Sequence, residues 1–265
     1  MKFANVNGTR TEPSPKLRGD CCYCGAPTSS RCGTKRVWHW AHKPNTHCDP
    51  WWENETEWHR QWKSFFPVEN QEIVHFDDNG EKHIADVKSD CGTVIEFQNS
   101  TMDSTELKSR ETFYGEMFWI VNASKFEKNF HVLDRLPNPL AKFAQDIVFC
   151  ARRAEWLGRG FWRLSENPDH TIGSDGLVEI HNMKKIDDKI DAEYVGHHLY
   201  DWKRPRTVWY ESTKRVLLDF GFEDSLMELQ TYRVYGAFAL PCVQYVSKRE
   251  LIESYGGAAR SEIVG

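Results

Sequence analysis

Three short β-rich segments separated by two glycine turns constrain this chain more than any other feature. The segments are EIVHF at 72–76, KHIADVKS at 82–89 and TVIEFQNS at 93–100. The turn sequences DDNG and SDCG between them each offer a glycine, which accepts a positive φ at no steric cost. The pattern therefore predicts three consecutive strands joined by tight turns.

Helical segments flank these strands on both sides. A tryptophan-rich helix of about 53–66 precedes them, and Pro67 ends it. A helix of about 104–117 follows the strands, and FWIVNAS at 118–124 is apolar enough for a buried strand. The predicted order is helix, three strands, helix, strand, within an α/β fold.

Polar side chains interrupt the second and third strands. Residues i and i+2 of a strand face the same side, so Glu96 and Gln98 project together, and the turn at 89–92 brings Asp86 opposite Glu96. Two carboxylates held this way repel unless a divalent cation lies between them. Mg²⁺ suits such oxygen ligands, and one of its waters can attack a phosphodiester. The alternative is that the carboxylates form hydrogen bonds specific to the fold and that Gln98 ties strands together.

A polar face on the first helix offers further candidates. Glu55, His59 and Lys63 recur every four residues and share one side of a helix. They can look over the metal site, with Glu55 as a further ligand and His59 and Lys63 on phosphate. The competing interpretation is a solvated ladder of charges.

Two residues of the second helix are spaced in the same way. Arg110 and Tyr114 are four positions apart. They can brace Gln98 or grip a DNA backbone, and a purely structural hydrogen bond is an equal alternative.

Several of these motifs together resemble a known family. The element order with D-x9-E-x-Q resembles the PD-(D/E)XK nuclease superfamily, and HWAH, ETEWHRQWK, HIADV, IEFQNS and SRETFY resemble the CoiA-like competence nucleases. The similarity covers about 20–124 closely and continues more weakly to the C-terminal part. Gln98 stands where the superfamily usually has lysine, and its amide can still position water.

The resemblance implies a restriction-endonuclease-like core, a mixed sheet flanked by helices, that hydrolyses DNA in competence, recombination or defence. It implies that Asp86 and Glu96 hold Mg²⁺ or Mn²⁺, helped by the Phe97 carbonyl, while Gln98 orients the water. A non-catalytic DNA-binding protein with a degenerate nuclease fold is the first alternative. An unrelated zinc-stabilised interaction protein is the second.

Five of the eight cysteines fall in the window 21–48. Cys21-x2-Cys24 followed by His39-x2-His42 has the pairing of a tetrahedral Zn²⁺ site, with a hairpin between the two pairs. Cys48 can replace one histidine, and Cys32 and His47 are spare candidates. Without metal, His39 would merely stack among its neighbouring tryptophans. So short a stretch, poor in aliphatic residues, needs a structural staple, and zinc is the expected one.

The charge of the chain limits how it can bind nucleic acid. The formal net charge is −5, so contacts to DNA must come from local basic patches. The candidates are 150–163 and 201–209, where Arg and Lys alternate with Trp and Phe. The alternative is that these cations cover half-buried aromatic rings.

The remaining features set the domain plan. We predict a zinc-ribbon-like module at 1–50, a nuclease core at 51–135 and an α/β C-terminal extension at 136–265, after the boundary LPNPL. In the extension we expect helices at 140–156 and 248–256, and strands at 207–212, 216–221 and 235–247. No apolar run approaches the roughly 18 residues of a membrane helix, so a cytoplasmic protein without membrane contact is expected.

Overall fold

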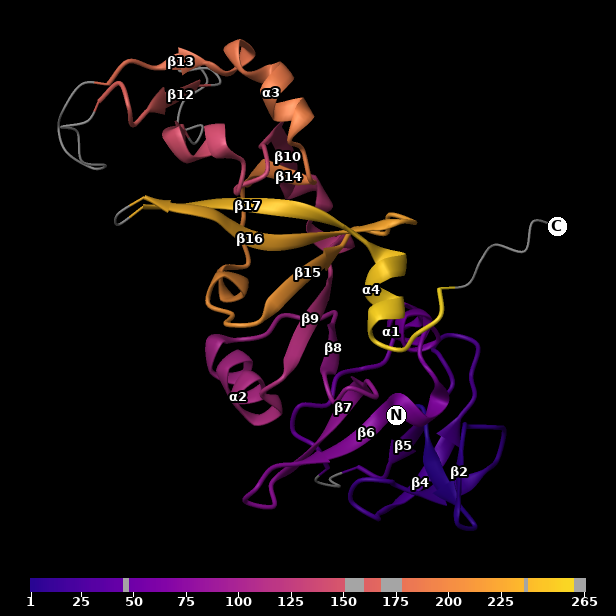
Figure 1. Cartoon of the computed structure of the whole chain (residues 1–265). Coiled ribbons are helices and arrows are strands. Elements are labelled where there is room, and N and C mark those ends of the chain that lie inside the picture. The colour runs from indigo at the N-terminus through magenta and orange to yellow at the C-terminus, as the bar shows by residue number, and fades with distance from the viewer. Residues whose placement is uncertain (45–47, 151–159, 168–177, 236–237, 260–265) are drawn as a thin grey trace. The chain divides into compact units, whose positions relative to one another are not determined.

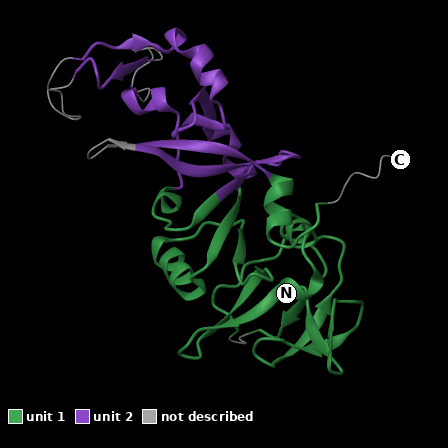
Figure 2. Cartoon of the chain, viewed as in Figure 1, with its two compact units in different colours: residues 1–122, 207–216, 248–265 green, residues 123–206, 217–247 purple. Residues whose placement is uncertain are grey.

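The structure is a computed structural model that describes residues 1–44, 48–150, 160–167, 178–235 and 238–259. The chain forms two compact units (Figure 2). The first unit comprises 1–122, 207–216 and 248–265, and the second comprises 123–206 and 217–247. The predicted ranges 1–50, 51–135 and 136–265 stay a prediction, and residues 1–50 share a unit with the segments that follow them.

The first unit begins with a five-stranded sheet in the order β2-β1-β3-β4-β5. Its adjacent strands pair antiparallel, and β4 and β5 form the hairpin that was predicted between the two ligand pairs. Its buried core consists of Met1, Ala4, Cys21 and Trp40. The strands are β1 (Ala4–Val6), β2 (Thr9–Thr11), β3 (Arg18–Asp20), β4 (Pro27–Arg31) and β5 (His39–His42).

The rest of the first unit has the predicted order of helix, three strands, helix, strand (Figure 1). Strands β6, β7 and β8 pair antiparallel, whereas β9 runs parallel to β8, so the sheet is mixed. The crossover from β8 to β9 runs through α2, as a parallel connection requires. The elements are α1 (Glu57–Lys63), β6 (Gln71–Phe76), β7 (Lys82–Lys88), β8 (Val94–Gln98), α2 (Ser104–Tyr114) and β9 (Met117–Asn122).

Local sequence signals explain where these elements begin and turn. Thr56 caps α1 by accepting from the His59 backbone N–H, and Asp103 caps α2 by accepting from two backbone N–H groups. Gly80 and Gly92 have φ values of +85° and +89° in the turns that join β6, β7 and β8. The predicted helix of 53–66 is shorter in the structure, because α1 begins only after the Thr56 cap.

The two helices pack on opposite sides of β8. The ring of Phe97 stacks on Trp62 of α1, with 5.7 Å between ring centroids. The neighbouring Glu96 faces α2, where Arg110 pairs with it. Because successive residues of a strand point to opposite faces, β8 is covered on both sides, and all five of its residues are buried.

Two later segments complete the first unit. A 3₁₀ turn, η6 (Thr207–Tyr210), stands where a strand at 207–212 was predicted, so that prediction was wrong. Its Trp209 packs edge-on against Trp119. Helix α4 (Lys248–Ser254) confirms the predicted C-terminal helix.

The second unit holds strands β10, β14, β17 and β16, which are neighbours in that order within a larger sheet, and a smaller three-stranded sheet, β11-β12-β13. Strand β15 (Arg215–Asp219) is divided between the two units, because the boundary falls between Val216 and Leu217. The other elements are β10 (Phe130–Arg135), β11 (Ile147–Phe149), β12 (Gly160–Arg163), β13 (His181–Asn182), α3 (Asp187–Ala192), β14 (His197–Trp202), β16 (Ser225–Tyr235) and β17 (Phe238–Ser247). The short 3₁₀ helices of this unit are η2 (Ser124–Asn129), η3 (Lys142–Asp146) and η5 (Met183–Lys185), and the first unit contains η1 (Val68–Asn70).

The predicted helix at 140–156 is wrong over its described part. Residues Lys142–Asp146 form a single 3₁₀ segment, and Ile147–Phe149 form a fully buried strand. Residues 151–156 lie outside the described part of the chain. The run Ile-Val-Phe favours a strand because β-branched and aromatic side chains pack well on a pleated surface.

A search of the described helices finds none that is both long and apolar enough to cross a membrane.

Candidate functional site

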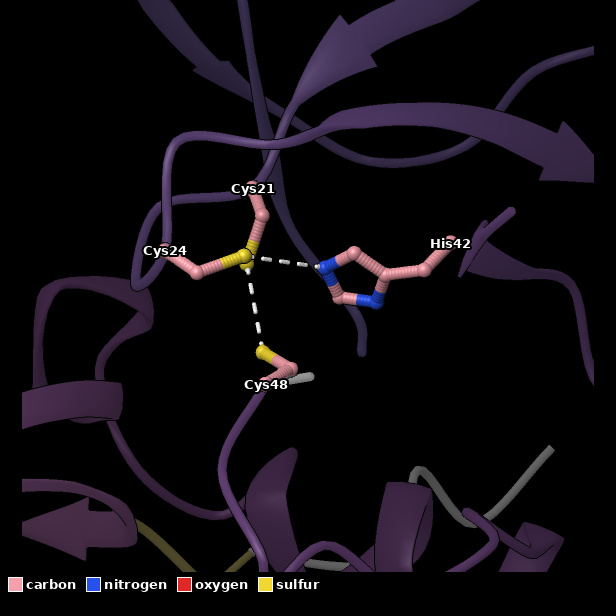
Figure 3. A group of neighbouring side chains, drawn as sticks. All are labelled: Cys21, Cys24, His42 and Cys48. Carbon is pink, nitrogen blue, oxygen red and sulfur yellow. Dashed lines mark hydrogen bonds between the residues drawn. The ribbon is translucent and has the colours of Figure 1, made fainter. Parts of the chain in front are cut away.

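Four side chains of the N-terminal sheet converge on one point: Cys21, Cys24, His42 and Cys48 (Figure 3). Their ligand atoms all lie within 4.8 Å of one another. The Sγ atoms of Cys21 and Cys48 are 3.8 Å apart, and Cys24 Sγ is 3.3 Å from His42 Nε2. Side chains of these types gathered this closely could hold a metal ion.

The turn between β3 and β4 presents the first two cysteines. The backbone N–H of Cys21 donates to Ala26 O, and Gly25, at φ +72°, donates back to Cys21 O. The backbone N–H of Tyr23 points at Cys21 Sγ, 3.4 Å away. A tight turn with an N–H group aimed at sulfur stabilises a thiolate, which is the form that binds metal.

The chemistry of the four donors fits zinc. Three sulfurs and one imidazole are a common tetrahedral zinc set. The hydrogen bond with Cys48 lowers the pKa of Cys21 to about 4, although burial opposes this shift. The group therefore already favours a thiolate, and the structure supports a zinc-type site in which Cys48 is a member.

The predicted ligand His39 lies outside this group. His39 and His42 are the two ends of strand β5, and residues three apart on a strand face opposite sides. The His39 ring is instead 2.8 Å from Val37 O. The spare candidate Cys32 is likewise outside the group, and His47 lies outside the described residues.

The second candidate site is a row of carboxylates across three neighbouring strands. Gln71 of β6 pairs with Val87 and Ile73 pairs with Ala85, so Glu72 lies opposite Asp86. In the β7–β8 ladder Val87 pairs with Ile95, so the next position places Asp86 opposite Glu96. Glu72, Asp86 and Glu96 line one cavity of about 60 Å³, together with Glu55 and Lys63. We call it the carboxylate cavity.

The carboxylates replace backbone bonds where β7 and β8 meet the cavity. The backbone N–H of Asp86 donates to Glu96 Oε1 at 3.1 Å, and the backbone N–H of Phe97 donates to Asp86 Oδ2 at 3.0 Å. Each side chain thus takes the place of a carbonyl of the ladder. This explains why acidic residues stand inside two otherwise apolar strands.

Lys63 is the central cation of the carboxylate cavity. Its Nζ lies 2.9 Å from Asp86 Oδ1, 3.1 Å from Glu72 Oε1 and 3.3 Å from Glu55 Oε1. Burial would lower the pKa of Lys63, but the three carboxylates together raise it well above its usual range. Glu55 precedes the Thr56 cap, so it lies outside α1, and the prediction that it shares a helix face with His59 and Lys63 was wrong. The three side chains are buried, so the interpretation as a solvated ladder was also wrong.

Arg110 is the cation on the other side of the row. Its guanidinium is 3.0 Å from Glu96 Oε2, donates to Trp51 O at 2.7 Å and also pairs with Glu106. Burial and the charge of Asp86 raise the pKa of Glu96 to about 8 despite Arg110. Arg110 is thus held by three acceptors, and its predicted contact with DNA stays a prediction.

Tyr114 does not line the carboxylate cavity. It packs edge-on against Phe113 and tilted against Trp51, and burial raises the pKa of its hydroxyl well above the usual range. Its position fits the structural alternative, and no contact with a substrate follows from it.

His59 forms a hydrogen bond with the Phe97 carbonyl, which was predicted to help bind metal. Its Nδ1 accepts from the Thr56 backbone N–H at 3.2 Å, so Nε2 carries the proton and donates to Phe97 O at 3.1 Å. The carboxylate of Glu53 lies 3.7 Å from the same Nε2. A metal at the Phe97 carbonyl would have to compete with this hydrogen bond.

Gln98 is buried, but it is not among the residues that line the carboxylate cavity. Its Nε2 donates to Ser100 Oγ at 3.1 Å. The amide that was predicted to orient water is therefore anchored to Ser100 at the end of β8. Lys63, by contrast, brings a cation into the cavity itself.

The sequence interpretation missed Glu72, Glu53 and Asp49. Glu72 accepts from the backbone N–H groups of Lys2 and Phe3, and it holds a φ of +46°, a conformation unusual for a residue with a side chain. Asp49 accepts from His83 and from the backbone N–H of Ile84. A glutamate directly before the apolar run 73–74 was the one available signal for Glu72, since these contacts join distant segments.

The described aromatic residues of the two predicted basic patches do not form stacking surfaces. Trp202 and Trp209 of 201–209 are buried, as are Phe161 and Trp162 of 150–163. The guanidinium of Arg206 lies over the Phe126 ring. The described aromatic residues of both patches belong to cores, which favours the alternative that cations cover buried rings, and 151–159 lie outside the described residues.

Comparisons of the chain with protein-family models, with curated proteins and with solved structures find no match.

Proposed function

We propose that this protein is a metal-dependent endonuclease that hydrolyses DNA phosphodiester bonds through a restriction-endonuclease-like core. The observation that carries the proposal is the carboxylate row of Glu72, Asp86 and Glu96, which shares one cavity with Lys63. The row stands on the element order α1-β6-β7-β8-α2-β9, with β8 and β9 parallel. This is the order in which the resembling superfamily carries its acidic pair.

The cavity has the donor chemistry for a hard divalent cation. Asp86 and Glu96 offer carboxylate oxygens, which Mg²⁺ and Mn²⁺ prefer, and such a cation would supply an activated water and neutralise a phosphate oxygen. Glu55 and Glu72 are the further carboxylates within reach of Lys63.

Lys63 would perform the role that lysine usually has in the resembling superfamily, because Lys63 lines the carboxylate cavity and Gln98 does not. An ammonium group beside Asp86 can hold a phosphate oxygen or a water by hydrogen bonds, which a glutamine tied to Ser100 does less directly. For a cation to bind Asp86, Lys63 must give up its 2.9 Å contact with Oδ1 and turn toward the substrate. Metal binding and substrate contact are thereby linked through one side chain.

We also propose that zinc held by Cys21, Cys24, His42 and Cys48 is structural. The four protein donors would close the tetrahedral shell and leave no position for substrate.

The experiment is cleavage of supercoiled plasmid by purified protein with Mg²⁺, with Mn²⁺ and with EDTA. Wild-type protein should nick or cut with either metal and not with EDTA. Asp86→Asn and Glu96→Gln should abolish cleavage, whereas Asp90→Asn should not. Asp90 follows β7 and bonds to Asn70, and it lies outside the carboxylate cavity. Undiminished cleavage by Asp86→Asn would overturn the assignment.

A second candidate function is DNA binding without catalysis. The favouring observation is that Lys63 and Arg110 already neutralise Asp86 and Glu96, each of which also bonds to backbone. This candidate predicts binding of DNA with no cleavage in either metal, so the same plasmid assay separates the two.

A further inference from the structure

A surface groove runs next to the carboxylate cavity and has a different lining. Its volume is about 480 Å³, and its lining includes Lys35, Arg36, His39, Trp52 and Thr56. Lys35 and Arg36 belong to the connection into β5, His39 is the first residue of β5, and Trp52 and Thr56 precede α1. We call it the tryptophan groove. It shares Met1, Trp52 and Glu55 with the carboxylate cavity, so the two spaces adjoin.

The two tryptophans of the sequence DPWWE have opposite surroundings. Trp51 stacks on His83 at a centroid distance of 3.3 Å and accepts a hydrogen bond from Arg110 at its carbonyl. Trp52 is 51% exposed, although tryptophan is among the most strongly buried residues on average. A single exposed ring needs no explanation by itself, but this ring lines a hollow that leads to a row of carboxylates.

The cations of the tryptophan groove are free to bind a ligand. Lys35 and Arg36 are exposed, and neither forms an ion pair with any residue that the structure describes. Arg60 and Lys63 of α1 are by contrast both paired with Glu55. Glu57 is the one exposed acidic residue in the lining.

We propose that the tryptophan groove binds an unpaired polynucleotide strand and guides its backbone into the carboxylate cavity. An exposed indole stacks on a base of any sequence, and flanking cations hold the phosphates. Bases in a duplex are already stacked on each other, so Trp52 selects a single strand or a frayed end. The proposal rests on the proposed function, since it names the substrate class of that site.

The test is a binding titration in Ca²⁺, which replaces Mg²⁺ so that affinity is read without turnover. The probes are fluorescein-labelled oligo(dU) and oligo(rU) of about 16 nucleotides, the upper site size for one single-strand-binding fold, and a duplex of the same length. Both single strands offer the recognised chemistry, and the tighter of the two identifies the sugar. We expect each to bind more tightly than the duplex.

Variants at the groove separate stacking from mere exposure of an aromatic ring. Trp52→Ala should weaken single-strand binding roughly 10-fold or more, in line with the loss of one stacked base, and Trp52→Phe should retain most of the affinity. Trp38→Ala is the matched control, because Trp38 is 47% exposed in the connection that carries Lys35 and Arg36 but does not line the groove. Equal losses from Trp52→Ala and Trp38→Ala would overturn the proposal, as would no loss from Trp52→Ala.

Charge variants test the phosphate contacts. The double substitution Lys35→Ala and Arg36→Ala should reduce the slope of log affinity against log salt by about 1.4, since each single-strand phosphate contact contributes roughly 0.7. Arg18→Ala with Lys43→Ala removes the same charge from a different hollow of the N-terminal sheet and should leave the slope unchanged. Equal slopes in the two double variants would contradict the proposal.

Failure of the inference and failure of the proposed function give different results. Single-strand binding that depends on Trp52, without cleavage in Mg²⁺ or Mn²⁺, keeps the groove and removes the nuclease. Metal-dependent cleavage with unchanged binding in Trp52→Ala keeps the nuclease and removes the groove.

Discussion

The cysteine group and the carboxylate cavity lie in the same unit and differ in how their charges are balanced. In the cysteine group three thiols and one imidazole face one another, and no lysine or arginine pairs with them among the described residues. In the carboxylate cavity, Lys63 and Arg110 contact the acidic side chains directly. One site therefore lacks a cation, and the other already contains two.

This difference teaches what a metal would do in each place. Binding of metal to the cysteine group adds the missing positive charge and so contributes directly to folding. Binding of metal to the carboxylate cavity exchanges one cation for another, so it changes chemistry more than stability. The comparison predicts that metal removal unfolds the sheet around the cysteine group and leaves the fold around the carboxylate cavity largely unchanged.

The largest effect is expected from loss of the cysteine ligands. Cys21→Ser with Cys24→Ser should remove about one zinc per chain and unfold the five-stranded sheet, because binding energy at such a site is folding energy. The buried core of that sheet is the small cluster of Met1, Ala4, Cys21 and Trp40, and two of the partly buried residues packed against it are the ligands Cys24 and Cys48. Elemental analysis and amide hydrogen exchange over 1–44 measure both losses.

A matched histidine pair controls this experiment. His42→Ala should lose zinc, whereas His39→Ala should keep it, since only His42 lies within the group. Loss of zinc from His39→Ala together with retention in Cys48→Ser would restore the original ligand prediction.

The next effect concerns the cation inside the carboxylate cavity. Lys63→Met leaves Glu55, Glu72 and Asp86 without their common partner and should lower the free energy of unfolding by roughly 3–5 kcal/mol. Lys108→Met is the control: Lys108 pairs with Glu211 on the exposed surface, and such pairs contribute about 0–1 kcal/mol. Urea denaturation measures both.

Adding Mg²⁺ to the Lys63→Met experiment tests whether the carboxylates can bind a divalent cation. If the carboxylates can hold a divalent cation, Mg²⁺ should raise the urea midpoint of Lys63→Met more than that of the wild type, because a ligand stabilises the state that binds it. An identical Mg²⁺ response in both proteins would show that the cavity is not a latent metal site.

Acid should lower the stability contributed by the carboxylate cavity through Glu72, by a smaller amount than the loss of Lys63. Lys63 lowers the pKa of Glu72 from 4.5 to about 2, although burial acts in the opposite direction. A carboxyl group with a lower pKa in the folded chain stabilises it above pH 4.5 and loses that contribution as the pH falls toward 2. The shift corresponds to about 3 kcal/mol at most.

The measurement is urea denaturation between pH 5 and pH 3 for the wild type and for Glu72→Gln. The wild type should lose more stability than the variant over this interval, because only the wild type has Glu72 to protonate. Glu69→Gln, an exposed neighbour, should follow the wild type. Parallel curves for wild type and Glu72→Gln would mean that Glu72 is not held as a carboxylate.

Local signals made the central part of the fold predictable. The strands at 72–100 were found because Gly80 and Gly92 mark turns that need positive φ, and α2 was found because Asp103 caps it. The pairing of Asp86 with Glu96 followed from strand geometry alone. Each of these signals lies within a few residues of the structure that it predicts.

The wrong predictions share a tertiary cause. The segment 207–212 has strand-forming residues, but Ser212 and the neighbouring Thr213 donate to the buried Glu111 and hold the chain in another conformation. Strand β16 was missed because consecutive residues Leu226 and Met227 are both buried, so no alternation marks it. Glu72 and Lys63 meet only through folding, and no local pattern connects them.

The smallest effect is expected at Gln98, where the sequence departs from the pattern of the superfamily that it resembles. Its amide nitrogen bonds to Ser100, which leaves the amide oxygen to accept a hydrogen bond from a water. Gln98→Ala should lower the cleavage rate by about 10-fold, equivalent to about 1.4 kcal/mol, with unchanged affinity for DNA in Ca²⁺, because the loss falls on the transition state.

Ser100→Ala is the control, since it frees the amide without removing it, and it should cost less. Gln98→Lys should retain cleavage, whereas Gln98→Glu should be slower than Gln98→Ala because it adds negative charge near the phosphate. Full activity in Gln98→Ala would assign the water to Lys63 alone, and the carboxylate cavity would then contain the whole of the catalytic chemistry.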